Sequence, residues 1–288
     1  MSIRFAGKTD VGLQRDHNED ALLIMPAHGV MIVADGLGGH RSGNIASELC
    51  VSTLSDFFTV TVRTDATWPF PYNDQLTDEE NYLFTGVRLA NRRIFDRSLK
   101  TMSDFGMGTT CVGAMFSKSG KTISISNVGD SRCYRIRGQN VKQLTRDHSL
   151  VSDALESAPW MSEEEIAKLP PNVITRALGI REDVIVDLHN EPTQPRDIYL
   201  ACSDGLSGVV GPGEMRDLVL SELQKDPSPT DQGLERAAHA LIERANYYGG
   251  PDNTTVALAY IEPADDTSDE VEPMATTERG RSEPPKGE

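Results

Sequence analysis

The apolar residues of this chain recur with two different spacings, which predict two kinds of element. Short apolar runs between turn residues are typical of strands, whereas apolar residues at every third or fourth position are typical of one helix face. The strands predicted in this way are residues 21–25, 29–34, 109–116, 122–128, 132–137, 141–144, 184–189, 197–203 and 254–261. The predicted helices are residues 42–60, 78–102, 213–225 and 230–247. Runs of hairpin strands beside separate helical blocks predict an α+β fold with antiparallel sheets.

Three segments fall outside this pattern. Residues 64–75 contain Trp68-Pro69-Phe70-Pro71, which cannot be regular helix, so we expect a surface loop. Residues 146–172 are polar and broken by prolines, which predicts a long excursion from the core, of a kind that is often functional. Residues 263–288 have scarcely any bulky apolar side chain and are predicted to be a disordered acidic tail, either a solvated terminus or a docking segment. Residues 1–262 then form one folded domain.

Acidic residues stand at the ends of several apolar strands that lie far apart in the chain. Asp35-Gly36 follows one such strand, Asp204-Gly205 follows another, and Asp252-Asn253 precedes the last. Glu19-Asp20 precedes the first predicted strand. Any one of these pairs alone would be an ordinary turn. Together they predict a site for a hard cation, because a carboxylate at the rim of a buried strand is costly without a compensating charge.

Composition and charge narrow the possible functions. The 288 residues are 38% hydrophobic and 25% charged, with a formal net charge of −16. This charge argues against binding to nucleic acid or to an anionic membrane surface. No apolar run approaches the roughly 20 residues that cross a bilayer, and no secretory leader is apparent. We therefore expect a cytoplasmic protein.

The four cysteines are scattered without metal-binding or disulfide spacing. Cys50, Cys111, Cys133 and Cys202 all lie in apolar surroundings, which predicts buried thiols in a reducing compartment. None of them lies in a Gly- and Arg-rich phosphate loop. A phosphocysteine mechanism is therefore disfavoured.

A set of motifs, taken in order along residues 4–262, resembles the metal-dependent Ser/Thr protein phosphatases of the protein phosphatase 2C family, in the bacterial form. The motifs are Arg15 with Asn18-Glu19-Asp20, Val33–His40, Gly108–Thr110, Asn127–Arg132, Ile174–Gly179, Ser203–Gly205 and Asp252–Thr255. The resemblance implies a four-layer αββα sandwich, with two antiparallel β-sheets packed face to face and helices outside each. The alternation of strands and helices agrees with this fold.

The resemblance also implies a ligand set and a reaction. Two Mn²⁺ or Mg²⁺ ions would share Asp35, and a third, looser ion would lie beside Asp130 and Asp204. The other implied groups are the Gly36 carbonyl, Asp204 and Asp252 as ligands, Glu19 and Asp20 as ligands or acceptors for metal-bound waters, and Arg15 as the residue that grips the phosphate. Two ions about 4 Å apart would neutralise the phosphate and lower the pKa of a bridging water. Carboxylates and carbonyls are the donors that these ions prefer.

The expected substrates are phosphoserine and phosphothreonine proteins, and the protein would oppose a Ser/Thr kinase, as a monomer. Two other functions stay open. A catalytically silent phosphatase-like binding module is disfavoured because Asp35, Asp204 and Asp252 are all present. A phosphoesterase for small-molecule phosphates would use the same metal chemistry and is not distinguished by the sequence.

One position departs from part of the family. Some members carry a histidine directly after the first Asp-Gly pair, where it has been assigned as the general acid. Here that position is Leu37, and His40 lies three residues further along. His40 is therefore a candidate acid, with water or a structural role for His40 as the alternatives.

Overall fold

The computed structural model describes residues 2–38, 42–61, 68–170, 173–226 and 230–263. Its strands are β1 (Ile3–Asp10), β2 (Asp20–Met25), β3 (Val30–Leu37), β4 (Gly108–Thr109), β5 (Cys111–Phe116), β6 (Thr122–Val128), β7 (Arg132–Arg137), β8 (Asn140–Gln143), β9 (Asp187–Pro192), β10 (Ile198–Cys202) and β11 (Thr254–Ile261). Its α-helices are α1 (Gly43–Thr61), α2 (Asp78–Lys100), α3 (Leu150–Ser157), α4 (Glu163–Ile166), α5 (Asp204–Ser207), α6 (Pro212–Leu223) and α7 (Asp231–Tyr247). Two 3₁₀ turns, η1 (Pro26–His28) and η2 (Met102–Asp104), complete the elements.

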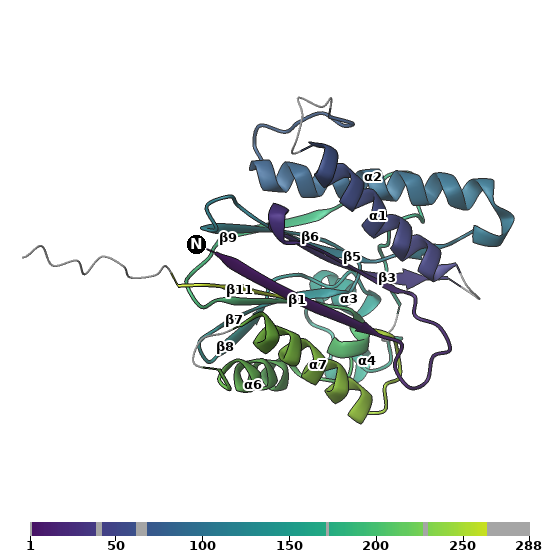
Figure 1. Ribbon diagram of the computed structural model, residues 1–288. Helices are drawn as coiled ribbons and strands as arrows, with labels where there is room; N and C mark the ends of the chain where they lie inside the picture. Colours follow the sequence, from purple (N-terminus) through teal and green to yellow (C-terminus); the bar gives the residue numbers. More distant parts are fainter. Residues whose placement is uncertain (1, 39–41, 62–67, 171–172, 227–229, 264–288) are drawn as a thin grey trace, which may run out of the picture.

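The strands form two sheets that pack face to face between two pairs of helices (Figure 1). One sheet has the order β1-β11-β10-β7-β8, and the other has the order β2-β3-β5-β6-β9, with β4 paired to β3. Neighbouring strands are antiparallel throughout these pairs. Helices α1 and α2 cover the outer face of the second sheet, and α6 and α7 cover the first. The predicted α+β sandwich is confirmed.

Burial on both faces explains why the central strands read as continuous apolar runs. In β3, Val30 and Ile32 pack against the helices, whereas Met31 and Val33 point into the interior between the sheets. Tyr199 of β10 meets them there from the other sheet. Side chains that alternate along β3 thus contribute to two apolar clusters, one between the sheet and its helices and one between the two sheets.

Most of the predicted elements appear with shifts of a few residues. The exceptions are instructive: β1 was not expected, and the strand predicted at 184–189 lies at Asp187–Pro192. β1 was missed because its burial pattern is mixed, with Lys8 and Asp10 interrupting the apolar sequence. Its partner β11 supplies the register, from Ile3 opposite Ile261 to Asp10 opposite Thr254.

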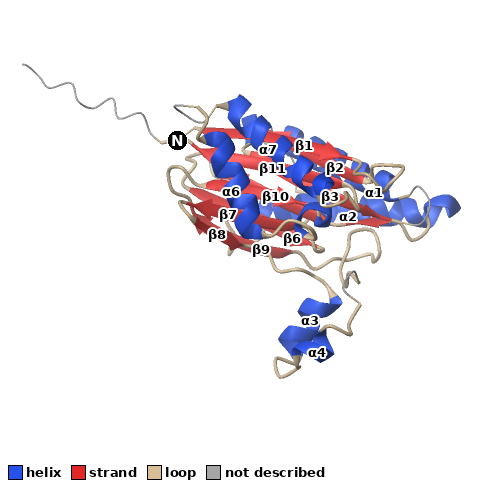
Figure 2. Cartoon of the chain, turned by 90° about the horizontal axis from the view of Figure 1, so that it is seen from below, coloured by secondary structure: helices blue, strands red, loops and turns tan. Residues whose placement is uncertain are grey.

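The excursion at 146–172 stands apart from the sandwich (Figure 2) and, where described, carries α3 and α4. Neither helix has a buried residue, so these two helices add little to the core. Its first residues are different: His148 is completely buried beneath the turn that joins β6 to β7. The predicted loop at 64–75 lies partly outside the described residues, and the predicted tail lies there from residue 264 onward.

Candidate active site

The acidic residues singled out in the sequence come together at one end of the sandwich. Asp20 begins β2 and lies directly opposite Asp35 near the end of β3. Asp130 lies in the turn between β6 and β7, where the chain crosses from one sheet to the other. Asp204 starts α5 directly after β10, and Asp252 precedes β11. Both sheets therefore contribute carboxylates to the same rim.

A cleft of about 270 Å³ opens at this rim. Its lining residues are Arg15, Glu19, Asp35, Gly36, Leu37, Gly38, Asp130, Ile174, Asp204, Asp252 and Asn253. The structure thus brings together most of the predicted site residues. Asp20 lies behind the cleft in contact with Ser203, and His40 lies outside the described residues.

The carboxylates are in an environment that disfavours their charged forms. Burial, together with the charges of Asp20, Asp204 and Asp130, raises the pKa of Asp35 well above its usual range. Burial raises the pKa of Asp20 to about 7 and that of Asp130 to about 6. The pKa of Asp204 is raised by burial and by the charge of Asp252. The cluster therefore holds more negative charge than its surroundings compensate.

Two carboxylate oxygens in this cluster lack a protein partner. Asp20 Oδ1 and Asp130 Oδ1 are buried and accept no hydrogen bond from any described residue. Asp20 Oδ2, by contrast, accepts a hydrogen bond of 2.8 Å from the Ser203 hydroxyl. A buried carboxylate oxygen without a donor is costly, and a divalent cation with oxygen preference would remove this cost. The donor chemistry therefore fits Mn²⁺ or Mg²⁺.

The acidic side chains of the cleft do not converge on a single point where an ion could lie. Within the described residues, no group of three or more His, Cys, Asp or Glu side chains is placed to hold one ion. The carboxylate of Asp252 already has partners: its Oδ2 is paired with Arg15 at 2.6 Å, and its Oδ1 accepts the backbone N–H of Asn253. Asp252 would have to turn away from Arg15 to join Asp204 on a cation.

The backbone around Asp35 is held by hydroxyl groups. Asp35 N–H donates to Thr110 Oγ1 at 3.0 Å, and the Asp35 carbonyl accepts from the backbone of Thr110 and the hydroxyl of Thr109. The Thr110 hydroxyl also lies 2.7 Å from that of Ser131, next to Asp130. Thr110, which lies between β4 and β5, thus connects the turn that carries Asp35 to the turn that carries Asp130. The sequence motif contained these threonines, but it did not assign them a role.

Asn253 holds the loop that carries Arg15 and Glu19 through hydrogen bonds of its side chain. Its side-chain oxygen accepts from the Glu19 N–H at 2.8 Å. Its amide group donates to the carbonyls of Val11 and His17. A buried side chain with all these partners fixes the loop on β11, next to Asp252.

A histidine that the sequence did not single out connects this rim to the root of the excursion. His148 Nδ1 accepts the backbone N–H of Gly129 at 2.9 Å, and its Nε2 lies 3.0 Å from Asp187 Oδ2. Asp187 is also paired with Arg176 at 2.6 Å. The ring nitrogen that accepts from Gly129 carries no proton, so the imidazole is neutral and donates from Nε2. No sequence spacing could have revealed these contacts between distant segments.

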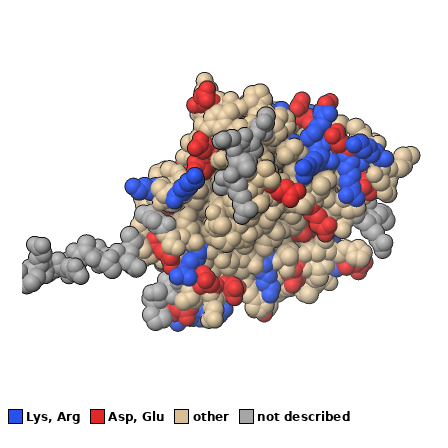
Figure 3. All heavy atoms as spheres, turned by 45° about the horizontal axis from the view of Figure 1, so that its top comes forward, with Lys and Arg blue, Asp and Glu red and all other residues tan. Residues whose placement is uncertain are grey.

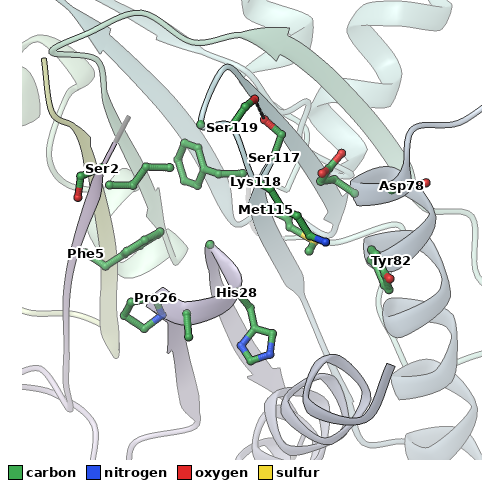
Figure 4. A pocket seen from close by; sticks show the side chains of 16 residues that line it. Ser2, Phe5, Pro26, His28, Asp78, Tyr82, Met115, Ser117, Lys118 and Ser119 are labelled. Atoms are coloured by element: carbon green, nitrogen blue, oxygen red, sulfur yellow. Dashed lines mark hydrogen bonds between the residues drawn. The ribbon is translucent and has the colours of Figure 1, made fainter. Parts of the chain in front are cut away.

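A second cavity, of about 670 Å³, lies at the opposite end of the sandwich (Figure 4). Its lining includes Phe5 of β1, Pro26 and His28 after β2, Lys118 between β5 and β6, and Tyr82 of α2. None of the predicted site residues lines it. Its larger volume therefore does not make it the candidate active site.

Comparison with known proteins shows the family of this chain. The sequence model for "Protein phosphatase 2C" matches residues 14–217. The serine/threonine phosphatase stp of Listeria welshimeri is 38% identical over 256 residues, which cover 87% of this chain and 93% of that protein. Protein phosphatase PhpP of Streptococcus pneumoniae is 31% identical, over 89% of this chain and 97% of that protein.

Solved structures give the same result. The serine/threonine phosphatase PstP/Ppp of Mycobacterium tuberculosis superposes with a TM-score of 0.74 at 30% identity, over 91% of this chain and 100% of that one. The catalytic domain of a PstP phosphatase in complex with two manganese ions has a TM-score of 0.71 at 31% identity, over 91% of this chain and 99% of that one. The chain belongs to the protein phosphatase 2C family and is a serine/threonine protein phosphatase, of a family that depends on metal ions.

Proposed function

We propose that this phosphatase hydrolyses phosphoserine and phosphothreonine residues of proteins in the carboxylate-lined cleft, with two Mn²⁺ or Mg²⁺ ions, and that it opposes a Ser/Thr kinase. The observation that carries the proposal is the convergence of buried carboxylates from both sheets on one cleft. When bound, the ions would neutralise the phosphate and lower the pKa of a water between them.

Within the proposal each acidic residue has a role. Asp35 would contact both ions, because it lies opposite Asp20 in the sheet and lines the same cleft as Asp204, whose charge adds to the effect of burial in raising the pKa of Asp35. The Gly36 carbonyl and Glu19 would be the further ligands of one ion. Asp204 and Asp252 would be the further ligands of the other ion. Asp20 would accept hydrogen bonds from ligand waters, since only its Oδ1 lacks a partner. Asp130 would support a looser third ion beside Asp204.

Arg15 and Asp252 would exchange partners on substrate binding. The guanidinium of Arg15 is half exposed and lies at the mouth of the cleft, where it is paired with Asp252. Its planar donors suit two phosphate oxygens, so the phosphate of a bound substrate would replace Asp252 on Arg15. Asp252 would then be free to turn towards Asp204. The ion pair thus keeps both side chains near the positions that the reaction requires.

A test compares phosphopeptides that differ only in the phosphorylated residue. We expect the protein to release phosphate from phosphoserine and phosphothreonine peptides in the presence of Mn²⁺, to act much more slowly on a phosphotyrosine peptide, and to stop when a chelator is added. Asp35→Ala, Asp204→Ala and Asp252→Ala should each abolish release while the circular dichroism spectrum is kept. Undiminished activity of Asp35→Ala with chelator present would contradict the proposal.

Two alternatives from the sequence are decided by the same experiment. A silent binding module would bind phosphopeptides without releasing phosphate. A small-molecule phosphoesterase would act on metabolite phosphates and leave the peptides unchanged. The similarity to named protein phosphatases over most of the chain favours the protein substrate.

A further inference from the structure

A shallow groove of about 210 Å³ lies beside the proposed active-site cleft. It is formed by the loop that returns from the excursion to β9, with Thr175–Ala177 on one limb and Asp183–Ile185 on the other. Ile180 and Arg181 close its far end.

The groove adjoins the cleft through two separate connections. Ile174 lines the cleft, and the next residue, Thr175, lines the groove. Leu37 of the cleft pairs with Gly108 of β4, and Gly108 packs against Ile180 so closely that a Cβ on this glycine would lie 2.9 Å from Ile180 Cδ1. A polypeptide whose phosphorylated residue occupies the cleft could therefore continue directly into the groove.

The groove is held in place by α2 and β4. Asn91 of α2 accepts the Gly179 N–H at 2.8 Å and donates to the carbonyls of Arg181 and Glu182. Leu178 is bridged to Thr109 through two backbone hydrogen bonds. A surface fixed in this way loses little conformational entropy when a ligand binds.

Among the described residues, the ion pairs around the groove leave the guanidinium of Arg181 without a carboxylate partner. Arg176 is paired with Asp187 at 2.6 Å, and Asp183 lies 3.4 Å from Arg88. Arg181 is exposed and forms no ion pair with any described residue. Ile180 and Ile185 are 50% and 71% exposed beside it. On a chain with a net charge of −16, the groove thus offers an unpaired guanidinium next to aliphatic side chains.

We infer that this groove binds the substrate polypeptide next to its phosphorylated residue, and that it selects an acidic side chain through Arg181, with an aliphatic side chain against Ile180 and Ile185. The inference rests on the proposed function, because it needs a phosphopeptide in the cleft. No residue that lines the groove also lines the cleft that holds the proposed metal ligands. The groove therefore governs which peptides bind, not the chemical step.

Reversing the charge of one residue on the peptide and of Arg181 on the enzyme tests this inference. A set of phosphoserine peptides would carry a single Glu, or a single Lys, in turn at each neighbouring position on either side of the phosphoserine. At one position, we expect the Glu peptide to have a KM about two- to five-fold lower than the Lys peptide, the range of an exposed ion pair. Arg181→Glu should reverse this preference at the same position, and p-nitrophenyl phosphate should be hydrolysed as before.

Lys118→Glu is the matched control, because it makes the same charge change at an exposed lysine beside the distant cavity (Figure 4). It should leave the order of the peptides unchanged. Ile185→Ala should raise the KM of peptides with a neighbouring Leu and not of those with a neighbouring Ala. The inference is overturned if Arg181→Glu and Lys118→Glu have the same effect on every peptide. If the parent protein hydrolyses none of the peptides, the proposed function itself is overturned.

Discussion

Single polar side chains hold the segments that carry the acidic residues of the candidate active site. Thr110, Ser203 and Asn253 each connect a segment that carries a carboxylate to a neighbouring strand or loop. The acidic residues could be predicted from sequence because a carboxylate after an apolar strand is conspicuous. The supporting residues could not, because a serine or threonine in a strand has no special spacing. Their role depends on which distant backbone group they meet.

His148 allows a pH-dependent test of this support. Burial lowers the pKa of His148, so the folded protein binds a proton there less readily than the unfolded chain, where the pKa is about 6.5. The stability that the neutral ring contributes is therefore fully present above that value and is lost as the pH falls below it. Asparagine at this position does not titrate.

We expect His148→Asn to lower the free energy of unfolding by about 1–3 kcal/mol near neutral pH, because Asp187 loses its donor. The difference in the free energy of unfolding between parent and variant should become smaller as the pH is lowered from about 8 to about 5. Denaturant unfolding in the presence of a chelator, at a series of pH values, measures this difference. A difference that stays constant or widens towards low pH would show that the ring is not held neutral by Gly129.

The general acid is a second question at this scale. His40 follows two glycines, which place few limits on the backbone, so we expect it not to act as the acid. His40→Ala should then slow a phosphoserine peptide and p-nitrophenyl phosphate to the same extent, or neither. General acid catalysis contributes about 10²–10⁴-fold and matters far more for the basic serine leaving group. A loss confined to the phosphoserine peptide would identify His40 as the acid.

At the scale of elements, the sequence predicted what depends on local pattern. Helix α2 has the apolar spacing, acidic first turn and Thr77–Glu80 capping box of a well-defined helix, and it was predicted within two residues at its end. The start of β9 was misplaced because Val184 and Ile185 are apolar yet belong to the groove loop. Helix α5 was missed because four residues are too few to show a period.

Close packing between β3 and α1 is a further property of elements. A Cβ on Gly36 would overlap the carbonyl oxygen of Gly43 at the start of α1. We expect Gly36→Ala to destabilise the protein by about 1–3 kcal/mol, the usual cost of overpacking, and to weaken Mn²⁺ binding because α1 must move away from the cleft. Gly213→Ala is the control, because Gly213 lies in α6 and nothing stands within 4 Å of its added Cβ. Thermal unfolding would measure the stability of each variant, and Mn²⁺ titration would measure its metal affinity. Equal stability and equal affinity of the two variants would contradict the packing argument.

The whole molecule combines an acidic chain with basic residues that are mostly held in ion pairs. Figure 3 shows Lys and Arg side chains gathered on part of one face, next to Asp and Glu side chains. On α2, Arg92 is paired with Glu182, and Arg97 with Asp104. No described helix is both long and apolar enough to span a bilayer. The order of strands and helices predicted an α+β fold with antiparallel sheets, and the family resemblance implied the four layers, but neither predicted the pairing of β1 with β11, the two ends of the domain.

The domain boundary gives a prediction at this scale. β11 ends at Ile261, and Glu262 is paired with Arg4 and donates its N–H to the Ser2 carbonyl. Deleting residues 263–288 retains these contacts, so we expect the free energy of unfolding to change by less than about 0.5 kcal/mol and peptide hydrolysis to stay nearly the same. Insoluble or unfolded protein after this deletion would show that the folded domain extends beyond residue 262.

The proposed reaction requires that the carboxylates of the cleft bind metal ions. The most direct measurement is the number of Mn²⁺ ions bound per chain, obtained by equilibrium dialysis of the parent protein and of Asp35→Asn and Asp204→Asn. We expect at least two ions on the parent protein, fewer on each variant, and the same circular dichroism spectrum for all three. The same number of tightly bound ions on all three proteins would contradict it.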